Sequence, residues 1–303
     1  MALLYWLEDL RIPIINELML AITYLGDEIA FLVVALILMW CVDKKTGYYV
    51  LSVGFLGTIT NQFMKLWFRV PRPWILDENF TILEQAREGA SGYSFPSGHT
   101  QSSVGTFGSI AYITKNKFLR SICLIAVVLV PFSRMYLGVH TPLDVCVAAA
   151  MAGVLIFGLK PVIMGKNERV FPIFLGIMVA VAVGFLCFVE LYPFPSDIDP
   201  HNMESGLKNA YTLLGSLLGL VIVYIIDNKW LHFPTKAVWW VQVIKVGIGL
   251  GLALIIKNGF KAPLEAVFGM LVGRSVRYFL IVIFAGIVWP LTFKWFASLG
   301  SKE

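Results

Sequence analysis

Two segments decide the fold of this chain: YSFPSGHT at residues 93–100 and SRMYLGVHTPLD at residues 133–144. Each segment holds one histidine beside a signal that starts a helix. Ser97 precedes an apolar run, and TPLD at residues 141–144 reads as an N-cap, a proline at the first helical position and an acid at the third. Helix N-termini bind anions through their free N–H groups, and Arg134 adds a charged donor. Two histidines, an arginine and a carboxylate together suggest phosphoryl chemistry.

The composition of the chain is that of a membrane protein. Of its 303 residues, 58% are hydrophobic and 14% are charged, and the mean hydropathy is +0.78. A soluble chain carries about 25% charged residues, so we predict an integral membrane protein. The net charge of +5 is expected from loops that orient the chain, and it implies no nucleic-acid partner. The cysteines lie far apart in apolar runs, without metal-type spacing, and read as small buried hydrophobic residues: Cys41, Cys123, Cys146 and Cys187.

The hydropathy pattern predicts an all-α polytopic membrane protein with about nine transmembrane helices. Residues 1–17 mix apolar and charged positions without a basic leader or a small-residue cleavage site, which indicates an N-terminal interfacial helix. Each span needs about 20 apolar residues. The expected spans are 18–42, 48–68, 98–114, 119–137, 141–159, 171–191, 207–226, 238–256 and 278–296.

The distribution of lysine and arginine orients these helices, because basic residues concentrate in cytoplasmic loops. With the N-terminus outside, the inner side holds twelve: Lys44, Lys45, Lys115, Lys117, Arg120, Lys160, Lys166, Arg169, Lys229, Lys236, Lys294 and Lys302. Without Lys65, Arg72 and Arg134 of the candidate site, the outer side holds eight: Arg11, Arg69, Arg87, Lys208, Lys257, Lys261, Arg274 and Arg277. This orientation places both histidine segments, with Lys65 and Arg72, at the outer ends of the second to fifth helices.

Three motifs then resemble one known family. KLWFRVPRP at residues 65–73, PSGH at residues 96–99 and SR-x5-H-x3-D at residues 133–144 are similar to the three signature motifs of the type 2 phosphatidic acid phosphatase superfamily, in the family order and spacing. The resemblance implies a metal-independent phosphohydrolase with a six-helix core and an active site at the outer membrane face. We therefore expect an interfacial helix at 1–17, a six-helix catalytic core at 18–192 and three additional C-terminal transmembrane helices at 193–303.

The chemistry of phosphate hydrolysis suggests a role for each motif residue. His140 is the expected nucleophile, oriented by Asp144 on its other ring nitrogen, and it would form a phosphohistidine. His99 is the expected general acid, which becomes the base when water attacks. No acidic cluster accompanies these groups, so we expect no metal ion and no cofactor. The remaining residues are expected to bind the phosphoryl oxygens through charge or N–H and O–H donors: Lys65, Arg72, Ser97, Gly98 and Arg134.

Several residues permit two interpretations. A single Lys, Arg or His at a helix end is usually an interfacial anchor, and Arg274 and Arg277 read as outer anchors of this kind. Asp27 and Glu28 lie either at a wet helix end or in the substrate pocket. Lys245 is either a paired structural lysine or a contact to substrate or a lipid headgroup.

The sequence thus predicts a membrane phosphatase that hydrolyses a lipid phosphate or pyrophosphate at the outer face of the cytoplasmic membrane. The candidate substrates are a polyprenyl pyrophosphate, phosphatidate and phosphatidylglycerophosphate, and substrate choice is assigned to the loop at 74–93 and the groove between helices. We expect inhibition by vanadate. A lipid phosphotransferase would use the same phosphohistidine. An anion transporter is a further alternative, but it would not need the pair of His140 and Asp144.

Overall fold

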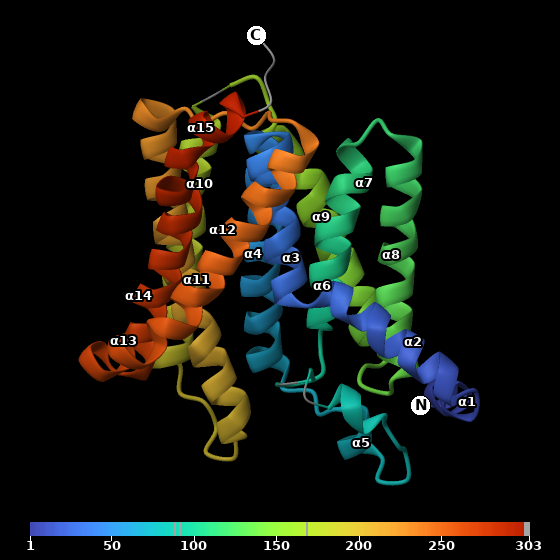
Figure 1. The fold of residues 1–303 in the computed structure, drawn as a ribbon. Coiled ribbons are helices and arrows are strands. Elements are labelled where there is room, and N and C mark those ends of the chain that lie inside the picture. The colour runs from blue at the N-terminus through green and yellow to red at the C-terminus, as the bar shows by residue number, and fades with distance from the viewer. Residues whose placement is uncertain (88, 91, 168, 300–303) are drawn as a thin grey trace. The chain divides into compact units, whose positions relative to one another are not determined.

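The computed structural model describes residues 1–87, 89–90, 92–167 and 169–299, and Lys302 of the charge comparison lies outside them. Over these residues the regular elements are helices and none is a strand, as predicted (Figure 1). The α-helices are α1 (Ala2–Asp9), α2 (Pro13–Thr23), α3 (Glu28–Ile37), α4 (Lys44–Phe68), α5 (Pro73–Leu76), α6 (Gly98–Ser103), α7 (Ser109–Ile113), α8 (Lys117–Tyr136), α9 (Pro142–Ile163), α10 (Val170–Leu191), α11 (Pro200–Ile226), α12 (Trp239–Gly259), α13 (Lys261–Phe268), α14 (Met270–Ile283) and α15 (Phe293–Ser298). Short 3₁₀ segments lie at Tyr24–Gly26, Glu84–Ala86 and Trp289–Thr292, and π segments at Leu38–Val42, Val104–Gly108, Asp227–Leu231 and Phe284–Val288.

The helices form two compact units, each built from separate stretches of chain. The first unit combines Met1–Val34, Tyr49–Pro161 and Pro195–Gly206. The second combines Ala35–Tyr48, Val162–Phe194 and the chain from Leu207 onward. All residues that the sequence assigned to catalysis or phosphate binding belong to the first unit. The expected division of the chain at residue 192 remains a prediction.

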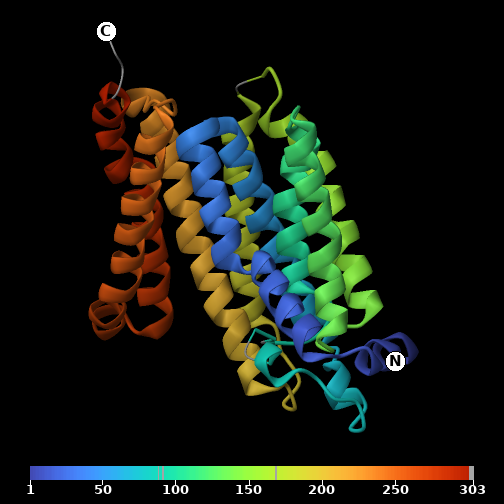
Figure 2. The same ribbon diagram turned by 45° about the vertical axis from the view of Figure 1, so that its right-hand side comes forward.

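Two helix starts in the first unit have the caps that the sequence predicts. The Ser97 hydroxyl accepts from the Thr100 N–H at 3.4 Å, at the start of α6. At the start of α9, the Thr141 N–H donates to Asp144 Oδ2 at 2.7 Å, and the Asp144 N–H donates to Thr141 Oγ1 at 3.3 Å. This reciprocal pair is a capping box, which holds the first turn of α9 in place. Figures 1 and 2 show α6 and α7 beside α8.

An apolar cluster fixes the loop between α8 and α9. Leu137 and Val139 of this loop are fully buried. They pack with residues of α1, α2, the 83–90 segment and the end of α8: Leu7, Met19, Leu20, Ala86, Ala90 and Tyr136. Removing one such buried side chain typically costs about 2–5 kcal/mol. The cluster therefore sets the backbone on both sides of residue 138, immediately before the second histidine of the motifs.

The first expected span is not one straight helix. Helix α2 and its 3₁₀ turn end at Gly26, α3 starts at Glu28, and the two axes differ by 56°. Gly26 approaches helices α6 and α8 so closely that a Cβ on this residue would lie 2.9 Å from atoms of His99 and Val130. Asp27 takes an extended conformation, which breaks the helical hydrogen bonding. The residues expected to form one interfacial helix at 1–17 are also divided, because Pro13 starts α2 after α1 has ended at Asp9.

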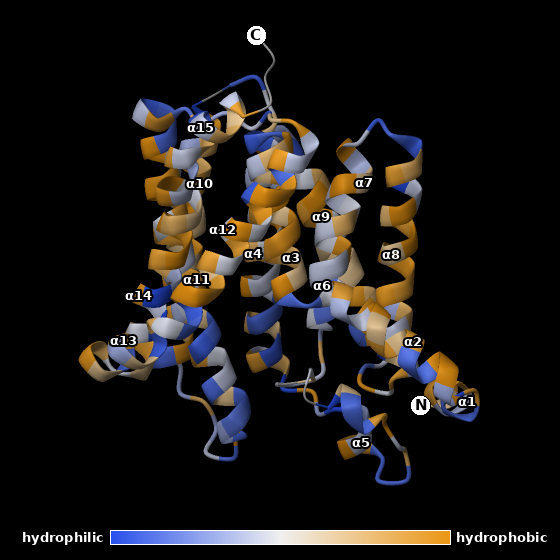
Figure 3. Ribbon diagram, in the orientation of Figure 1, coloured by the Kyte–Doolittle hydropathy of each residue, from blue (hydrophilic) through white to orange (hydrophobic). Residues whose placement is uncertain are grey.

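The helices identify the protein as an integral, multi-pass membrane protein. Among the described residues, six helical segments are long and apolar enough to cross a bilayer: Lys117–Tyr136, Pro142–Ile163, Val170–Leu191, Pro200–Leu231, Trp239–Gly259 and Met270–Ser298. A seventh is added if the bent pair Pro13–Gly26 and Glu28–Val42 is one span. Large apolar side chains face outward on α8, including Leu124, Ile125 and Val128, and apolar colouring predominates along α8 (Figure 3).

Two predictions about lysine and arginine are resolved in the second unit. Lys245 is buried in α12, donates to the Trp40 carbonyl at 2.8 Å and lies 4.4 Å from the centre of the Phe293 ring, which favours the structural interpretation. Arg277 is buried in α14, with Nη1 3.8 Å from Glu265 Oε1. The interpretation of Arg277 as an exposed interfacial anchor is therefore wrong, because α13 turns back and covers it with an acid.

Candidate active site

Three cations that the sequence assigned to phosphate binding are buried in the first unit. Lys65 lies in the last turn of α4, Arg72 directly precedes α5, and Arg134 lies in the last turn of α8. Their exposed fractions are 5%, 4% and 1%. Lys65 Nζ donates to the Tyr93 carbonyl, and Arg134 Nη1 donates to Thr23 Oγ1 at 2.7 Å. Three buried cations in one place are costly without an anion to neutralise them.

Arg72 links this cluster to His140. Its Nη1 lies 2.9 Å from His140 Nε2 and also donates to the Val139 carbonyl at 2.9 Å, while Nε donates to the Gly92 carbonyl at 3.0 Å. A guanidinium group can only donate, so His140 Nε2 is the acceptor and the proton of the neutral ring is on Nδ1. Burial lowers the pKa of Arg72 to about 10, and the charge of Asp144 acts in the opposite direction.

The electrostatic surroundings keep His140 neutral. Burial is the largest cause that lowers the pKa of His140 well below its usual 6.5, and the positive charges of Arg72, Arg134, Lys65 and His99 lower it further. A neutral imidazole has a free lone pair, which a nucleophile at phosphorus requires. The ring is therefore in the reactive protonation state at neutral pH.

Asp144 lies beside the other nitrogen of this ring. Its Oδ2 is 3.4 Å from His140 Nδ1, and Nδ1 has no hydrogen-bond partner within the described part of the chain. The same Oδ2 accepts from Ser94 Oγ at 2.6 Å and from the Thr141 N–H at 2.7 Å. Sequence analysis missed Ser94. Its position two residues before the PSGH motif is the only signal that could have indicated it.

His99 has an acidic partner from a different helix. His99 Nε2 lies 2.8 Å from Asp27 Oδ1, and their side chains are 16% and 37% exposed. The bend between α2 and α3 brings Asp27 to this position, next to the close contact of Gly26 with His99. Of the two acids that the sequence could not assign, Asp27 therefore belongs to the site. Glu28 is exposed at the first position of α3.

The start of α6 adds neutral groups between the two histidines. Ser97 is fully buried, and its N–H donates to the main-chain carbonyl of Asp144 at 3.1 Å, which ties the start of α6 to that of α9. Gly98 is half-buried, and a Cβ at this position would lie 3.8 Å from Asn61 Oδ1. Asn61 Nδ2 donates to the Pro96 carbonyl at 3.2 Å, and its buried Oδ1 has no partner among the described residues. The structure thus brings together all eight residues that the motifs suggested.

A cavity of about 370 Å³ reaches the cation cluster at Arg72. Its remaining walls come from the residues after α4, from α5 and Tyr93, and from the segment that leads into the first turn of α11: Arg69, Pro71, Ile75, Tyr93, Asp197, Ile198, Asp199 and Asn202. The sequence assigned substrate choice to the 74–93 loop, and two lining residues, Ile75 and Tyr93, come from it. The contribution of residues 197–202 was missed, because they follow the motifs by more than 50 positions.

The arrangement has the chemical groups that phosphoryl transfer needs. Three cations lie beside a neutral imidazole and a second histidine that has an acidic partner. Their three positive charges exceed the two negative charges of the nearby acids, Asp27 and Asp144. Arg134 Nε is buried and has no hydrogen-bond partner in the described residues, so it is available to an oxygen of a bound anion. The described residues include no cluster of three or more His, Cys, Asp or Glu side chains suited to a metal ion.

An all-helical membrane protein with these groups falls in the class of integral membrane phosphatases. Residues 45–168 match the profile of the PAP2 superfamily, and residues 211–302 match the profile described as PAP2 superfamily phosphatase, transmembrane extension. The chain belongs to the PAP2 superfamily, as the three motifs predict, and is a phosphatase.

Three curated relatives support this assignment. The chain is 31% identical over 175 residues to phosphatidylglycerophosphatase B of Bacillus subtilis, covering 53% of this chain and 79% of the relative. It is 30% identical over 136 residues to undecaprenyl-diphosphatase of Sulfolobus acidocaldarius, covering 45% and 64%. It is also 30% identical over 153 residues to undecaprenyl-diphosphatase BcrC of Bacillus subtilis, covering 48% and 74%. No solved structure matches the chain.

Proposed function

We propose that the protein hydrolyses a lipid phosphate or pyrophosphate through a phosphohistidine formed on His140. One observation carries the proposal: Arg72 Nη1 lies 2.9 Å from His140 Nε2, within a buried group of three cations. A phosphate that binds to Arg72 is thereby placed next to the nitrogen that attacks it. When the guanidinium group donates to phosphate oxygens instead of to Nε2, the lone pair of Nε2 becomes free to attack phosphorus.

In the first step, His140 Nε2 forms a bond to phosphorus and the bond to the leaving oxygen breaks. Asp144 stabilises the imidazole because it lies beside Nδ1–H, while Ser94 and the Thr141 N–H hold the carboxylate in position. His99 donates a proton to the leaving oxygen. His99 enters this step as the imidazolium: Nε2–H stays on Asp27, and the proton is donated from Nδ1, which leaves a neutral ring ready to act as the base.

In the second step, His99 removes a proton from water, which attacks the phosphohistidine and releases inorganic phosphate. Lys65, Arg72 and Arg134 balance the charge on the phosphoryl oxygens in both steps, and Ser97 and the Gly98 N–H add neutral donors. If a lipid hydroxyl replaces water in this step, the same intermediate makes the protein a phosphotransferase. We propose water as the acceptor, because the relatives with matching sequences are named as phosphatases.

The relatives also suggest the substrate. Phosphatidylglycerophosphate and polyprenyl pyrophosphates are the substrates that their names indicate, and we propose a lipid of this group for the present chain. Phosphatidate is a candidate with a single phosphate. The chemistry assigned to these residues needs neither a metal ion nor a cofactor, so we propose that activity persists in EDTA.

We further propose that nine spans cross the membrane, with the active site at the outer face. The helix α4 and the α6–α7 run would be spans in addition to the six apolar segments and the bent pair. Residues 18–192 would form the catalytic core and residues 193–303 the three additional helices. An interfacial position for the N-terminus is supported by α1, in which Leu4 and Leu7 are buried while Trp6 is exposed.

The experiment that tests the function is a substrate panel in detergent with EDTA. Phosphate release is measured for phosphatidylglycerophosphate, a polyprenyl pyrophosphate, phosphatidate and a soluble phosphate monoester, with wild-type protein and with the variant His140→Ala. We expect release from at least one lipid, and loss of that release to background in the variant. Substantial phosphate release by His140→Ala protein that is inserted normally would refute the nucleophile.

A further inference from the structure

The residue that follows α4 has an unusual backbone conformation. Arg69 has φ +49, and its N–H donates to the Lys65 carbonyl at 3.0 Å, which closes the helix with a left-handed cap. Glycine is the usual residue at this position, because a Cβ is crowded by the backbone in the left-handed region. An arginine there has a conformational cost, which indicates a role for its side chain.

Arg69 lines the cavity that reaches Arg72. Arg69 is half-buried, and in the described part of the chain no hydrogen bond or ion pair holds its guanidinium group. Arg72, by contrast, donates to two carbonyl oxygens and contacts His140. The cavity therefore contains one arginine bound to the reacting nitrogen and a second one whose donors are available to a ligand.

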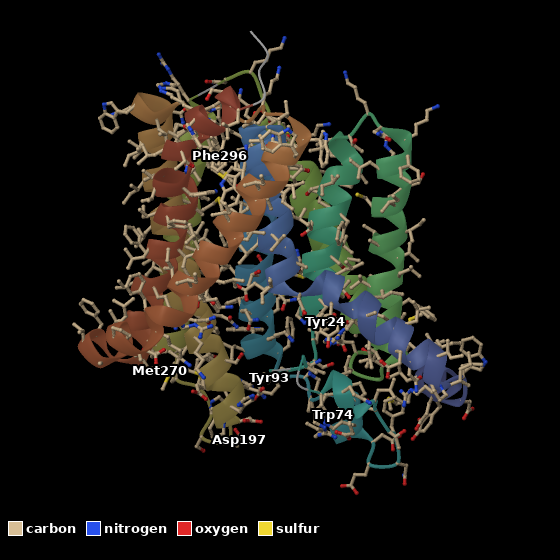
Figure 4. All side chains as sticks on the ribbon, in the orientation of Figure 1. Tyr24, Trp74, Tyr93, Asp197, Met270 and Phe296 are labelled. Carbon is tan, nitrogen blue, oxygen red and sulfur yellow. The ribbon has the colours of Figure 1, made fainter. Side chains whose placement is uncertain are left out.

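The other residues that line this cavity determine what kind of ligand fits. Tyr93 and Asp197, both labelled in Figure 4, line the cavity together with Asp199 and Asn202. The Asp199 carboxylate already caps α11, because it accepts from the His201 N–H at 2.8 Å and the Asn202 N–H at 3.4 Å. Asp197 is exposed to solvent, where its charge is screened. The positive charges that line the cavity are thus the two guanidinium groups of Arg69 and Arg72, which suit an anion with two neighbouring phosphates.

We propose that Arg69 binds a second phosphate of the substrate, next to the phosphate that reacts with His140. The inference rests on the function proposed above and narrows its substrate class. Lipids that carry two neighbouring phosphates, either in a pyrophosphate or as a monoester close to a phosphodiester, are preferred to lipids with a single phosphate. Phosphatidate is therefore the poorest of the three candidate substrates.

The test compares two substrates that differ only in the second phosphate. Farnesyl diphosphate and farnesyl monophosphate share one lipid chain, and initial rates of phosphate release give kcat/KM for each. With Arg69→Ala, we expect kcat/KM for the diphosphate to fall about 10- to 100-fold, the usual effect of losing a charged hydrogen bond. For the monophosphate we expect a change below about threefold. Arg69→Lys should restore part of the preference, since it keeps the charge without the planar pair of donors.

Two further variants separate binding from backbone effects. Arg69→Gly removes the side chain and also relieves the left-handed strain, so it should raise the melting temperature while losing the diphosphate preference as fully as Arg69→Ala does. Arg87→Ala is the matched control, because Arg87 is an exposed arginine of the adjacent loop that pairs with Glu84 at 2.7 Å and does not line the cavity. Arg87→Ala should leave the substrate preference unchanged.

The outcomes distinguish this inference from the proposed function. Suppose that wild-type protein hydrolyses both substrates. If Arg69→Ala then lowers kcat/KM for both substrates equally, or lowers kcat/KM for neither of them, Arg69 does not bind a second phosphate. The phosphatase mechanism stands in that case. If wild-type protein hydrolyses neither substrate while it releases phosphate from another lipid, the second-phosphate subsite is also rejected. If His140→Ala retains the wild-type rate on farnesyl diphosphate, the mechanism itself is wrong.

Discussion

Replacing Asp27 tests the assignment that depends most on tertiary structure. Asp27 Oδ1 lies 2.8 Å from His99 Nε2, and its side chain is 37% exposed. A hydrogen bond to a charged group contributes about 1.5–3 kcal/mol and a neutral one about 0.5–1.5 kcal/mol. Asp27→Asn keeps the shape but changes a charged bond to a neutral one. Because solvent screens the partly exposed carboxylate, we take the difference between the lower ends of these two ranges, about 1 kcal/mol. A loss of this size lowers kcat about fivefold. Asp27→Ala also leaves the ring nitrogen without a partner, and kcat should fall about 10- to 100-fold.

The assay is steady-state phosphate release, with kcat and KM determined separately. Since Asp27 orients the general acid and does not contact the substrate, kcat should fall while KM changes little. Glu28→Gln is the matched control, because it removes the charge of the next residue, which is exposed at the first position of α3, and its kcat should stay within about twofold of wild type. An Asp27→Ala protein with kcat within threefold of wild type would refute the role, and so would equal losses in Asp27→Asn and Glu28→Gln.

Three other predictions follow from the site. Ser94→Ala removes the 2.6 Å hydrogen bond to Asp144, and we expect about a 3- to 15-fold lower rate of phosphohistidine formation in rapid-quench experiments; an unchanged rate would show that Ser94 does not position Asp144. Orthovanadate, which adopts the five-coordinate geometry of the transition state, should inhibit more tightly than phosphate, and Arg134→Lys should weaken that inhibition because an ammonium group cannot make a planar two-pronged contact. Equal affinity for the two anions, independent of His140, would favour a transport protein. For sidedness, a cysteine at Asn79 in protein lacking the four native cysteines should react with a membrane-impermeant thiol reagent in intact cells, and one at Asn116 should not; the reverse pattern would place the active site in the cytoplasm.

The parts of the fold that sequence analysis predicted well are those set by local patterns. A low content of charged residues places the chain in a bilayer whatever its detailed packing, because charged side chains are too costly there. The start of α9 follows from Thr141, Pro142 and Asp144, whose capping bonds span only three residues. The break after Gly26 was not predicted, since it depends on a close approach to His99, which lies 73 residues later in the chain.

By itself, the sequence predicted an integral membrane protein, the helical class, the superfamily and eight candidate site residues, because composition, capping signals and motif spacing are all properties of neighbouring positions. Only the tertiary structure decided that Asp27 is the partner of His99, which it reaches across a helix bend, and that Ser94 reaches Asp144 across a distance of 50 residues. It also decided that Arg72 contacts His140 and that Arg69 lines the adjacent cavity. These pairings require separate helices of the first unit to pack together, and no local pattern specifies contacts between segments that lie far apart in the chain.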